Sequence, residues 1–311
     1  MSYLETQRQK SVGLRDDIFK DPGGGIFKKS ERVFVLKEPA LNLWAGVRED
    51  VINYFSFYGI PFWDSGNEPT GHLLSSQIAC LNHLYFIRQR VDVAKQILKA
   101  VDKNIKSALR MDNGVGDNGF VDFEVVGAKN YLNEKLHTRG ANATSVDAVM
   151  LAEMNNGQRK LIFIEWKYVE KYGSSSKATD KSGPRRIKIY STLLEKSDCP
   201  FRVTNIEGLF TEPYYQLMRQ TLLANEMAKA KEYGANDYLH LHIIPTANIE
   251  LKEVNTAAGK LDGNNLKETW TNLLKLPEKY KAIDPKDFLL PALKCSDTKA
   301  AINYLQQRYW H

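Results

Sequence analysis

The sequence predicts an α/β fold in which a mixed central β-sheet is flanked by helices, with an extension at each end of the chain. Two observations predict it. Residues 144–151 and 161–169 are apolar runs without Gly or Pro, which indicates buried strands. Segments on either side carry apolar residues every three or four positions, which indicates helices. The middle of the chain therefore reads as helix, three strands, helix and strand.

The first seventy residues are the least regular part of the sequence. A breaker cluster at 21–25 indicates a turn, because no lysine-plus-hydroxyl signature of a phosphate-binding loop follows its glycines. Residues 32–36 predict a short strand, and the spacing in 41–58 predicts a helix. Ser75 and Ser76 then cap a segment, 77–108, that is spaced for one long helix or two.

The remaining elements follow in order along the chain. Residues 120–126 alternate apolar side chains with Asp122 and Glu124, which predicts a strand with one face in water. Further elements are expected as a helix at 213–233, a strand at 237–245, and helices at 265–276 and 298–309. We divide the chain into an N-terminal extension (1–72), a core (73–250) and a C-terminal helical extension (251–311) packed on the core.

Composition sets broader limits on function. The chain has 311 residues, 43% of them hydrophobic, and 43 basic against 37 acidic side chains give a net charge of +6. This mild excess permits a polyanionic partner without requiring one. The three cysteines form no CxxC pair, which favours a reducing, cytoplasmic setting over a disulfide or zinc framework. No apolar run is long enough to predict a membrane span or a signal peptide.

Two strands carry charges inside apolar sequence. Asp147 lies in the first, and Glu165 and Lys167 lie in the second, where alternation places both on one face. Carboxylates on neighbouring strands can converge on one hard cation, and a lysine beside them can hold an attacking water or stabilise charge on phosphorus. The alternative is structural: a buried Glu–Lys pair and a capping Asp at strand ends. The spacing alone leaves both interpretations open.

The order of elements, with Ser145-Val146-Asp147 on one strand and Glu165-Trp166-Lys167 on the next, resembles the PD-(D/E)XK nuclease superfamily, which has the restriction-endonuclease-like fold. The resemblance covers about 75–245, and Val146 replaces the proline of the motif. It implies that Asp147, Glu165 and the Trp166 carbonyl bind Mg²⁺ or Mn²⁺, and that Lys167 assists the attacking water. It also implies hydrolysis of DNA, with a homodimer as one way of cutting two strands, although no heptad or apolar seam indicates a dimer.

The resemblance implies accessory residues too. Many members carry an acid on the first core helix, and Gln77 is expected in its place. The helix after the third strand often contributes to the site, which makes Gln216, Arg219 and Gln220 candidates. Ordinary polar residues on a helix face explain these last three at least as well.

The segment 170–188 is rich in Gly, Ser and basic residues, and we expect it to be poorly ordered. It is either a solvated linker or a mobile loop that grips phosphates. In the second interpretation the nucleic-acid-binding residues are Lys177, Lys181, Arg185, Arg186 and Lys188.

Two other functions compete with a nuclease. His240 and His242 lie two apart on one strand, a spacing that metal hydrolases use. The second alternative is a catalytically silent module that keeps the fold and binds nucleic acid or protein. The intact set of Asp147, Glu165 and Lys167 argues against it.

Overall fold

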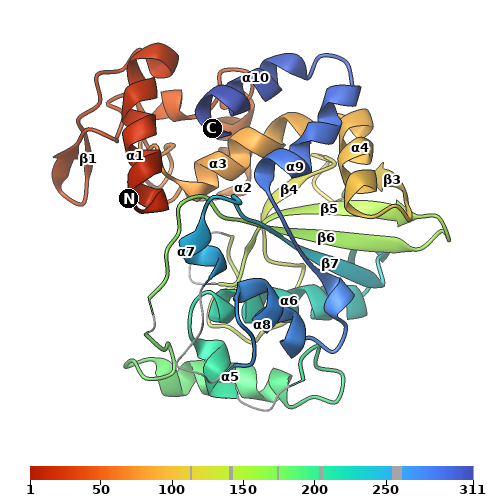
Figure 1. Cartoon of the computed structure of the whole chain (residues 1–311). Coiled ribbons are helices and arrows are strands. Elements are labelled where there is room, and N and C mark those ends of the chain that lie inside the picture. Colours follow the sequence, from red (N-terminus) through yellow and green to blue (C-terminus); the bar gives the residue numbers. More distant parts are fainter. Residues whose placement is uncertain (113, 140–142, 174, 203–205, 254–260, 311) are drawn as a thin grey trace.

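The computed structural model describes residues 1–112, 114–139, 143–173, 175–202, 206–253 and 261–310. Its centre is a six-stranded mixed sheet, and a small antiparallel hairpin of β1 (Gly25–Phe27) and β2 (Ser30–Arg32) lies apart from it (Figure 1). The strands of the central sheet are β3 (Ile105–Leu109), β4 (Asp122–Val125), β5 (Val146–Met154), β6 (Arg159–Trp166), β7 (Asp237–Ile243) and β8 (Tyr280–Ile283).

The spatial order of the strands is β3-β5-β6-β7-β8, and β4 pairs with the other end of β5. The pairs β3–β5, β4–β5 and β5–β6 are antiparallel, whereas β6–β7 and β7–β8 are parallel. The predicted mixed sheet is thus confirmed. Strands β5 and β6 are antiparallel because a short turn joins them. Strands β6 and β7 can be parallel because a long crossover that contains helices joins them.

Helices cover both faces of the sheet, as Figure 1 shows, and each face has its own apolar core. One core contains Ile162, Ile164 and Trp166 of β6, and the other contains Leu161 and Phe163, as strand alternation requires. The helices are α1 (Tyr3–Leu14), α2 (Arg48–Tyr58), α3 (Ser76–Leu84), α4 (Val91–Val101), α5 (Gly183–Leu194), α6 (Tyr214–Lys229), α7 (Ile249–Lys252), α8 (Leu266–Leu273), α9 (Pro285–Leu289) and α10 (Lys299–Arg308).

Two strands of the sheet are missing from the sequence prediction. β3 falls inside the segment expected to be helical, because a turn at Asp102, whose carboxylate accepts the N–H of Asn104, ends α4 and starts the strand. β8 has four residues and forms the opposite edge, paired with β7. Short edge strands carry too few residues to show a period of two.

Three other expectations were wrong in part. The helix expected at 41–58 begins only at Arg48, after a 3₁₀ turn at Pro39–Asn42. The strand expected at 32–36 ends at Arg32, and Val35 makes an isolated bridge with His72 instead. The segment 170–188, in which Ser174 lies outside the described residues, runs into α5, which begins at Gly183 with Pro184 in its first turn and buries Tyr190 and Leu193.

Residues from both ends of the chain join the core on one face of the sheet. Val51 and Phe55 of α2 and Ile302 and Leu305 of α10 belong to the same apolar cluster as the β6 side chains that face them. Both termini lie on this side of the sheet in Figure 1. No helix within the described ranges is long and apolar enough to cross a membrane.

Candidate active site

Three acidic residues lie in a row across neighbouring strands. Ala148 of β5 pairs with Ile164 of β6, so the next position places Asp147 opposite Glu165. On the other side of β5, the pairs of Phe123 with Ala148 and of Val125 with Val146 place Glu124 of β4 opposite Asp147. An Asp147 Oδ2 atom accepts the backbone N–H of Trp166 at 2.7 Å, which ties the end of β6 to this carboxylate.

Lys167 lies directly after β6 and is almost fully buried beside Glu165. Its Nζ atom donates to Glu165 Oε1 and to Gln216 Oε1, both at 2.6 Å. Burial lowers the pKa of Lys167, but its acidic neighbours, Glu165 foremost, together outweigh this effect, and the pKa is raised above its ordinary value. Lys167 is therefore a cation that donates hydrogen bonds within the site.

Helix α6 covers these residues and supplies two amides to them. Gln216 accepts from Lys167, and Gln220 donates through Nε2 to Glu165 Oε2 and, at 3.1 Å, to the backbone carbonyl of Ser145. The third candidate on this helix, Arg219, does not join them. It instead pairs with Glu134 at 3.2 Å.

Gln77 of α3 reaches the site through an acid that the sequence pattern did not single out. Its Nε2 atom donates to Glu124 Oε1, and Ser145 Oγ donates to Glu124 Oε2, both at 2.9 Å. Glu124 adopts a left-handed backbone with φ of 50°, which is costly for a residue with a side chain. The expectation that its strand has a wet face was wrong, because Asp122 and Glu124 are both buried.

Negative charge in this row is only partly balanced. Burial raises the pKa of Asp147, and the carboxylates of Glu165 and Glu124 raise it further, while Lys167 and the Trp166 N–H act in the opposite direction. Burial is also the main cause of the raised pKa of Glu124. Such a row fits a divalent cation, which would offset the repulsion between the carboxylates.

Asp147 and Glu165, with carbonyl and water oxygens, are the kind of ligand set that Mg²⁺ takes, because magnesium usually keeps several waters and binds through one or two carboxylates. Among the described residues, no group of three or more His, Cys, Asp or Glu side chains could hold a metal ion by itself. Both oxygens of Glu165 already accept hydrogen bonds, from Lys167 and Gln220, but each retains a second lone pair.

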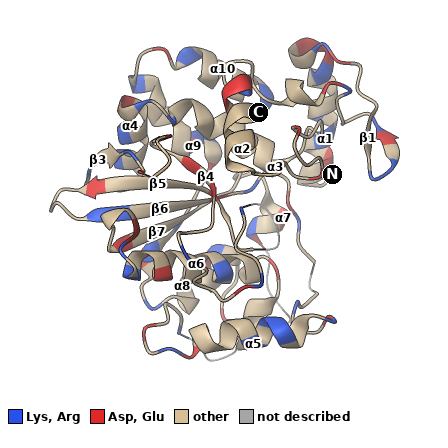
Figure 2. Cartoon of the chain, turned by 180° about the vertical axis from the view of Figure 1, so that it is seen from behind, with Lys and Arg blue, Asp and Glu red and all other residues tan. Residues whose placement is uncertain are grey.

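The predicted basic residues separate into two groups. Lys177, Arg185 and Arg186 line a hollow of about 530 Å³, together with Lys135 and Arg219. Lys181 and Lys188 do not line it. Figure 2 shows basic residues along α5, which lies at the bottom of the view, below α6 and the sheet. Two of the cations already have acidic partners, since Arg186 pairs with Asp180 at 2.6 Å and Arg219 with Glu134.

The two histidines of the alternative metal site are fully buried beneath α6. His240 Nδ1 lies 3.0 Å from Thr221 Oγ1, and His242 Nδ1 lies 3.0 Å from the Tyr280 hydroxyl. Burial lowers the pKa of His240 to about 3, so both rings are neutral members of the core. Within the described residues they have no third ligand beside them.

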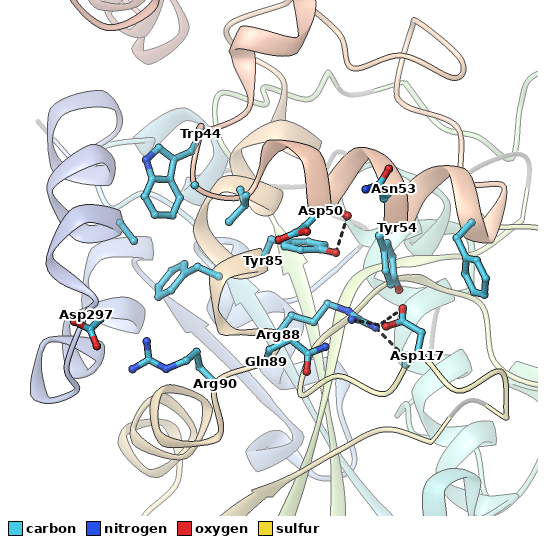
Figure 3. Close-up of a pocket in the computed structure, with 15 residues that line it drawn as sticks. Trp44, Asp50, Asn53, Tyr54, Tyr85, Arg88, Gln89, Arg90, Asp117 and Asp297 are labelled. Carbon is cyan, nitrogen blue, oxygen red and sulfur yellow. Dashed lines mark hydrogen bonds and ion pairs between the residues drawn. The ribbon is translucent and has the colours of Figure 1, made fainter.

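A separate cavity of about 690 Å³ lies between α2 and the end of α3 (Figure 3). It is lined by Trp44, Tyr54, Tyr85 and Arg88, and the Arg88 guanidinium pairs with Asp117 at 2.8 Å. None of the predicted site residues lines it.

Comparison with known proteins places the chain in one family. A family model described as "Restriction Endonuclease associating with ARP" matches residues 14–310. Neither a curated protein nor a solved structure matches the chain. The match spans nearly the whole sequence and agrees with the restriction-endonuclease-like architecture of the sheet. The chain therefore belongs to the family of restriction endonucleases associating with ARP, whose function is of the nuclease type.

Proposed function

We propose that this protein hydrolyses phosphodiester bonds of DNA in a magnesium-dependent reaction carried by Asp147, Glu165 and Lys167. One observation carries the proposal: a buried lysine lies 2.6 Å from one carboxylate and beside a second, at adjoining positions of two paired strands. Membership of a restriction-endonuclease family supports the same reaction class.

Asp147, Glu165 and the Trp166 carbonyl would hold the cation, with Mn²⁺ as a substitute for Mg²⁺. When bound, the metal polarises the phosphoryl oxygen and offsets charge that develops on the phosphate. The raised pKa of Asp147, caused first by burial and then by the carboxylates of Glu165 and Glu124, supports this assignment, because a bound cation would stabilise the charged form of Asp147.

The chain's own residues orient the reactants. The Lys167 ammonium donates hydrogen bonds toward the attacking water or the phosphoryl oxygen, and Glu165 and Gln216 fix its position. Gln220 fixes Glu165 in turn. Glu124 lies beside Asp147 in the row of acids. Hydrogen bonds from Gln77 and Ser145 fix its carboxylate there.

The substrate's phosphates require cations outside this row. Lys177 and Arg185 line the hollow beside α6 without an acidic partner among the ion pairs of the described residues. They are suited to phosphate contacts, which contribute affinity and position but carry no sequence information.

Calorimetric titration of Mg²⁺ and Mn²⁺ tests the metal site. We expect the wild type to bind metal, and a variant with Asp147→Asn and Glu165→Gln to lose that binding. Glu153→Gln is the matched control, since Glu153 is an acid at the far end of the same strand, paired with Lys106. Equal metal binding by the double variant and the wild type would contradict the assignment and favour a silent binding module.

A further inference from the structure

The cleft lined by Asp147 and Glu124 has an aromatic wall. Its volume is about 700 Å³, and Trp63 and His72 line it together with the two acids. All five tryptophans of the chain are described, and Trp63 alone is exposed, with 47% of its surface accessible. An exposed indole therefore shares one cleft with Asp147, one of the two proposed metal-binding carboxylates, and with its neighbour Glu124.

Trp63 is held in place by the same network that holds Glu124. Its backbone N–H donates to Gln77 Oε1 at 2.9 Å, and Gln77 donates in turn to Glu124. Its ring lies edge to face against His72, with centroids 5.5 Å apart, and 5.8 Å from the ring of Phe27. These contacts restrain the ring at a fixed place relative to the acids while its exposed part remains free for a ligand.

The β1–β2 hairpin places two cations next to this wall. Phe27 pairs with Ser30, so Lys28 and Lys29 form the two-residue turn, and their φ angles are 50° and 63°. Such a turn favours Asn and Gly, because other side chains are strained at positive φ. Lys28 Nζ lies 5.2 Å from the centroid of the Phe27 ring. The strained turn thus holds the exposed Lys28 beside the Phe27 ring and presents Lys29, which is also exposed, at the next position.

An indole can stack only on a base whose face is open. In a continuous duplex each base is covered by its neighbours, whereas an unpaired base can leave the stack and lie on an aromatic side chain. A cleft of this size accommodates a group as large as a nucleotide. Lysines beside an aromatic platform supply the phosphate contacts that single-strand binding also needs.

We propose that an unpaired DNA base stacks on Trp63 while Lys28 and Lys29 contact the flanking phosphates, so that the preferred substrate is single-stranded where it enters the cleft. This inference rests on the proposed function, because the strand held in this way leads to Asp147. It names the substrate class of that site.

Binding measured by fluorescence anisotropy in EDTA tests the proposal without cleavage. The probes are a labelled single-stranded oligonucleotide and the duplex of the same sequence. Trp63→Ala is expected to weaken single-strand binding about tenfold, as expected when one base no longer stacks. Trp63→Phe is expected to weaken it less than about threefold, because a phenyl ring also stacks. Binding to the duplex is expected to be the same in all three proteins.

Two further variants sharpen the test. Phe57→Ala is the matched control, because Phe57 is another exposed aromatic side chain but lines the cavity of Figure 3, and no change is expected. A Lys28→Gln and Lys29→Gln double variant is expected to reduce the salt dependence of single-strand binding, by about 0.7 in the logarithmic slope for each phosphate that is no longer neutralised.

The proposal is overturned if Trp63→Ala binds the single strand as the wild type does, or weakens duplex binding equally. Failure of the proposed function gives a different result. In that case the wild type binds no metal and cleaves neither probe, whether or not Trp63 contributes to single-strand binding. A wild type that cleaves the duplex and the single strand at equal rates, unaffected by Trp63→Ala, contradicts the substrate class alone.

Discussion

At the scale of single residues, Asp147 is a buried carboxyl whose pKa is raised well above its ordinary value. Burial and the two neighbouring acids disfavour its charged form. We therefore expect Asp147→Asn to raise the free energy of unfolding in EDTA by about 1 kcal/mol, as residues at functional sites often oppose stability. In Mg²⁺ the difference is expected to shrink, because metal binding stabilises only the native wild type.

Urea denaturation at pH 8, with and without Mg²⁺, measures this effect. Glu153→Gln serves as the control and is expected to change stability by less than about 0.5 kcal/mol. If Asp147→Asn proves less stable than the wild type in EDTA, the Asp147 carboxylate stabilises the folded protein. This would contradict the expectation that burial and the two neighbouring acids make its charge unfavourable.

The sequence could predict that Asp147, Glu165 and Lys167 lie together, because strand alternation and the pairing of neighbouring strands determine their places. It could not predict Glu124. An acid that alternates with apolar residues indicates a solvent-facing side of a strand. The left-handed backbone of Glu124 and its contacts with Gln77 and Ser145 cannot be inferred from the neighbouring residues in the sequence.

At the scale of elements, β7 is buried beneath α6 with neutral histidines, which makes stability depend on pH. The pKa of His240 is lowered to about 3, against an ordinary value of 6.5. As the pH falls below about 6.5, the unfolded chain takes up a proton that the folded chain does not, so the free energy of unfolding decreases. The contribution of one such histidine between pH 7.5 and 5.5 is about 1.4 kcal/mol.

Chemical denaturation at these two pH values compares the wild type with His240→Gln. The variant is expected to lose less stability on acidification by about the contribution of that one histidine. Equal losses would show that His240 is protonated in the folded protein or does not differ from the unfolded chain.

Helix α5 and the segment before it supply three cations of the hollow, Lys177, Arg185 and Arg186. Lys177→Gln with Arg185→Gln is expected to weaken binding to duplex DNA and to reduce its salt slope by about 0.9 for each phosphate that these cations cease to neutralise. Lys181→Gln with Lys188→Gln removes the same charge from residues that do not line the hollow and is the control. Anisotropy titrations at several salt concentrations distinguish the two, and equal effects would indicate a general charge effect instead of a site.

Helices and strands could be predicted where the periodic spacing of apolar residues extends over many positions. The long apolar strands β5, β6 and β7 and helix α6 show clear periods, whereas β3 and β8 are short edges whose place depends on their partners. Helix α5 escaped prediction because Gly, Ser and basic residues precede and begin it. Its apolar face becomes apparent only when Tyr190 and Leu193 are seen in the core.

At the scale of the whole molecule, Arg308 ties the last helix to the N-terminal region. It is buried, donates to the backbone carbonyl and the side chain of Asn42, and lies 4.9 Å from the centroid of the Phe19 ring. Arg308→Met is expected to lower the free energy of unfolding by about 3 kcal/mol, because the buried Asn42 Oδ1 loses its donor and the Asn42 carbonyl keeps only the Asn82 amide.

Hydrogen exchange shows how far this destabilisation spreads. If the extensions fold together with the sheet, exchange in β5 and β6 rises along with exchange in α10. A rise confined to α10 and the segment around Asn42 would show that the extensions unfold independently, as separate stability units.

Cleavage rates of supercoiled plasmid and single-stranded DNA in Mg²⁺ test most directly whether Asp147 and Lys167 carry the hydrolysis. The wild type is compared with Asp147→Asn and Lys167→Gln, and circular dichroism checks that each protein is folded. We expect cleavage by the wild type and a reduction of about a thousandfold in each folded variant, since each removes charge stabilisation from the same transition state. Cleavage by either variant at the wild-type rate would contradict this expectation.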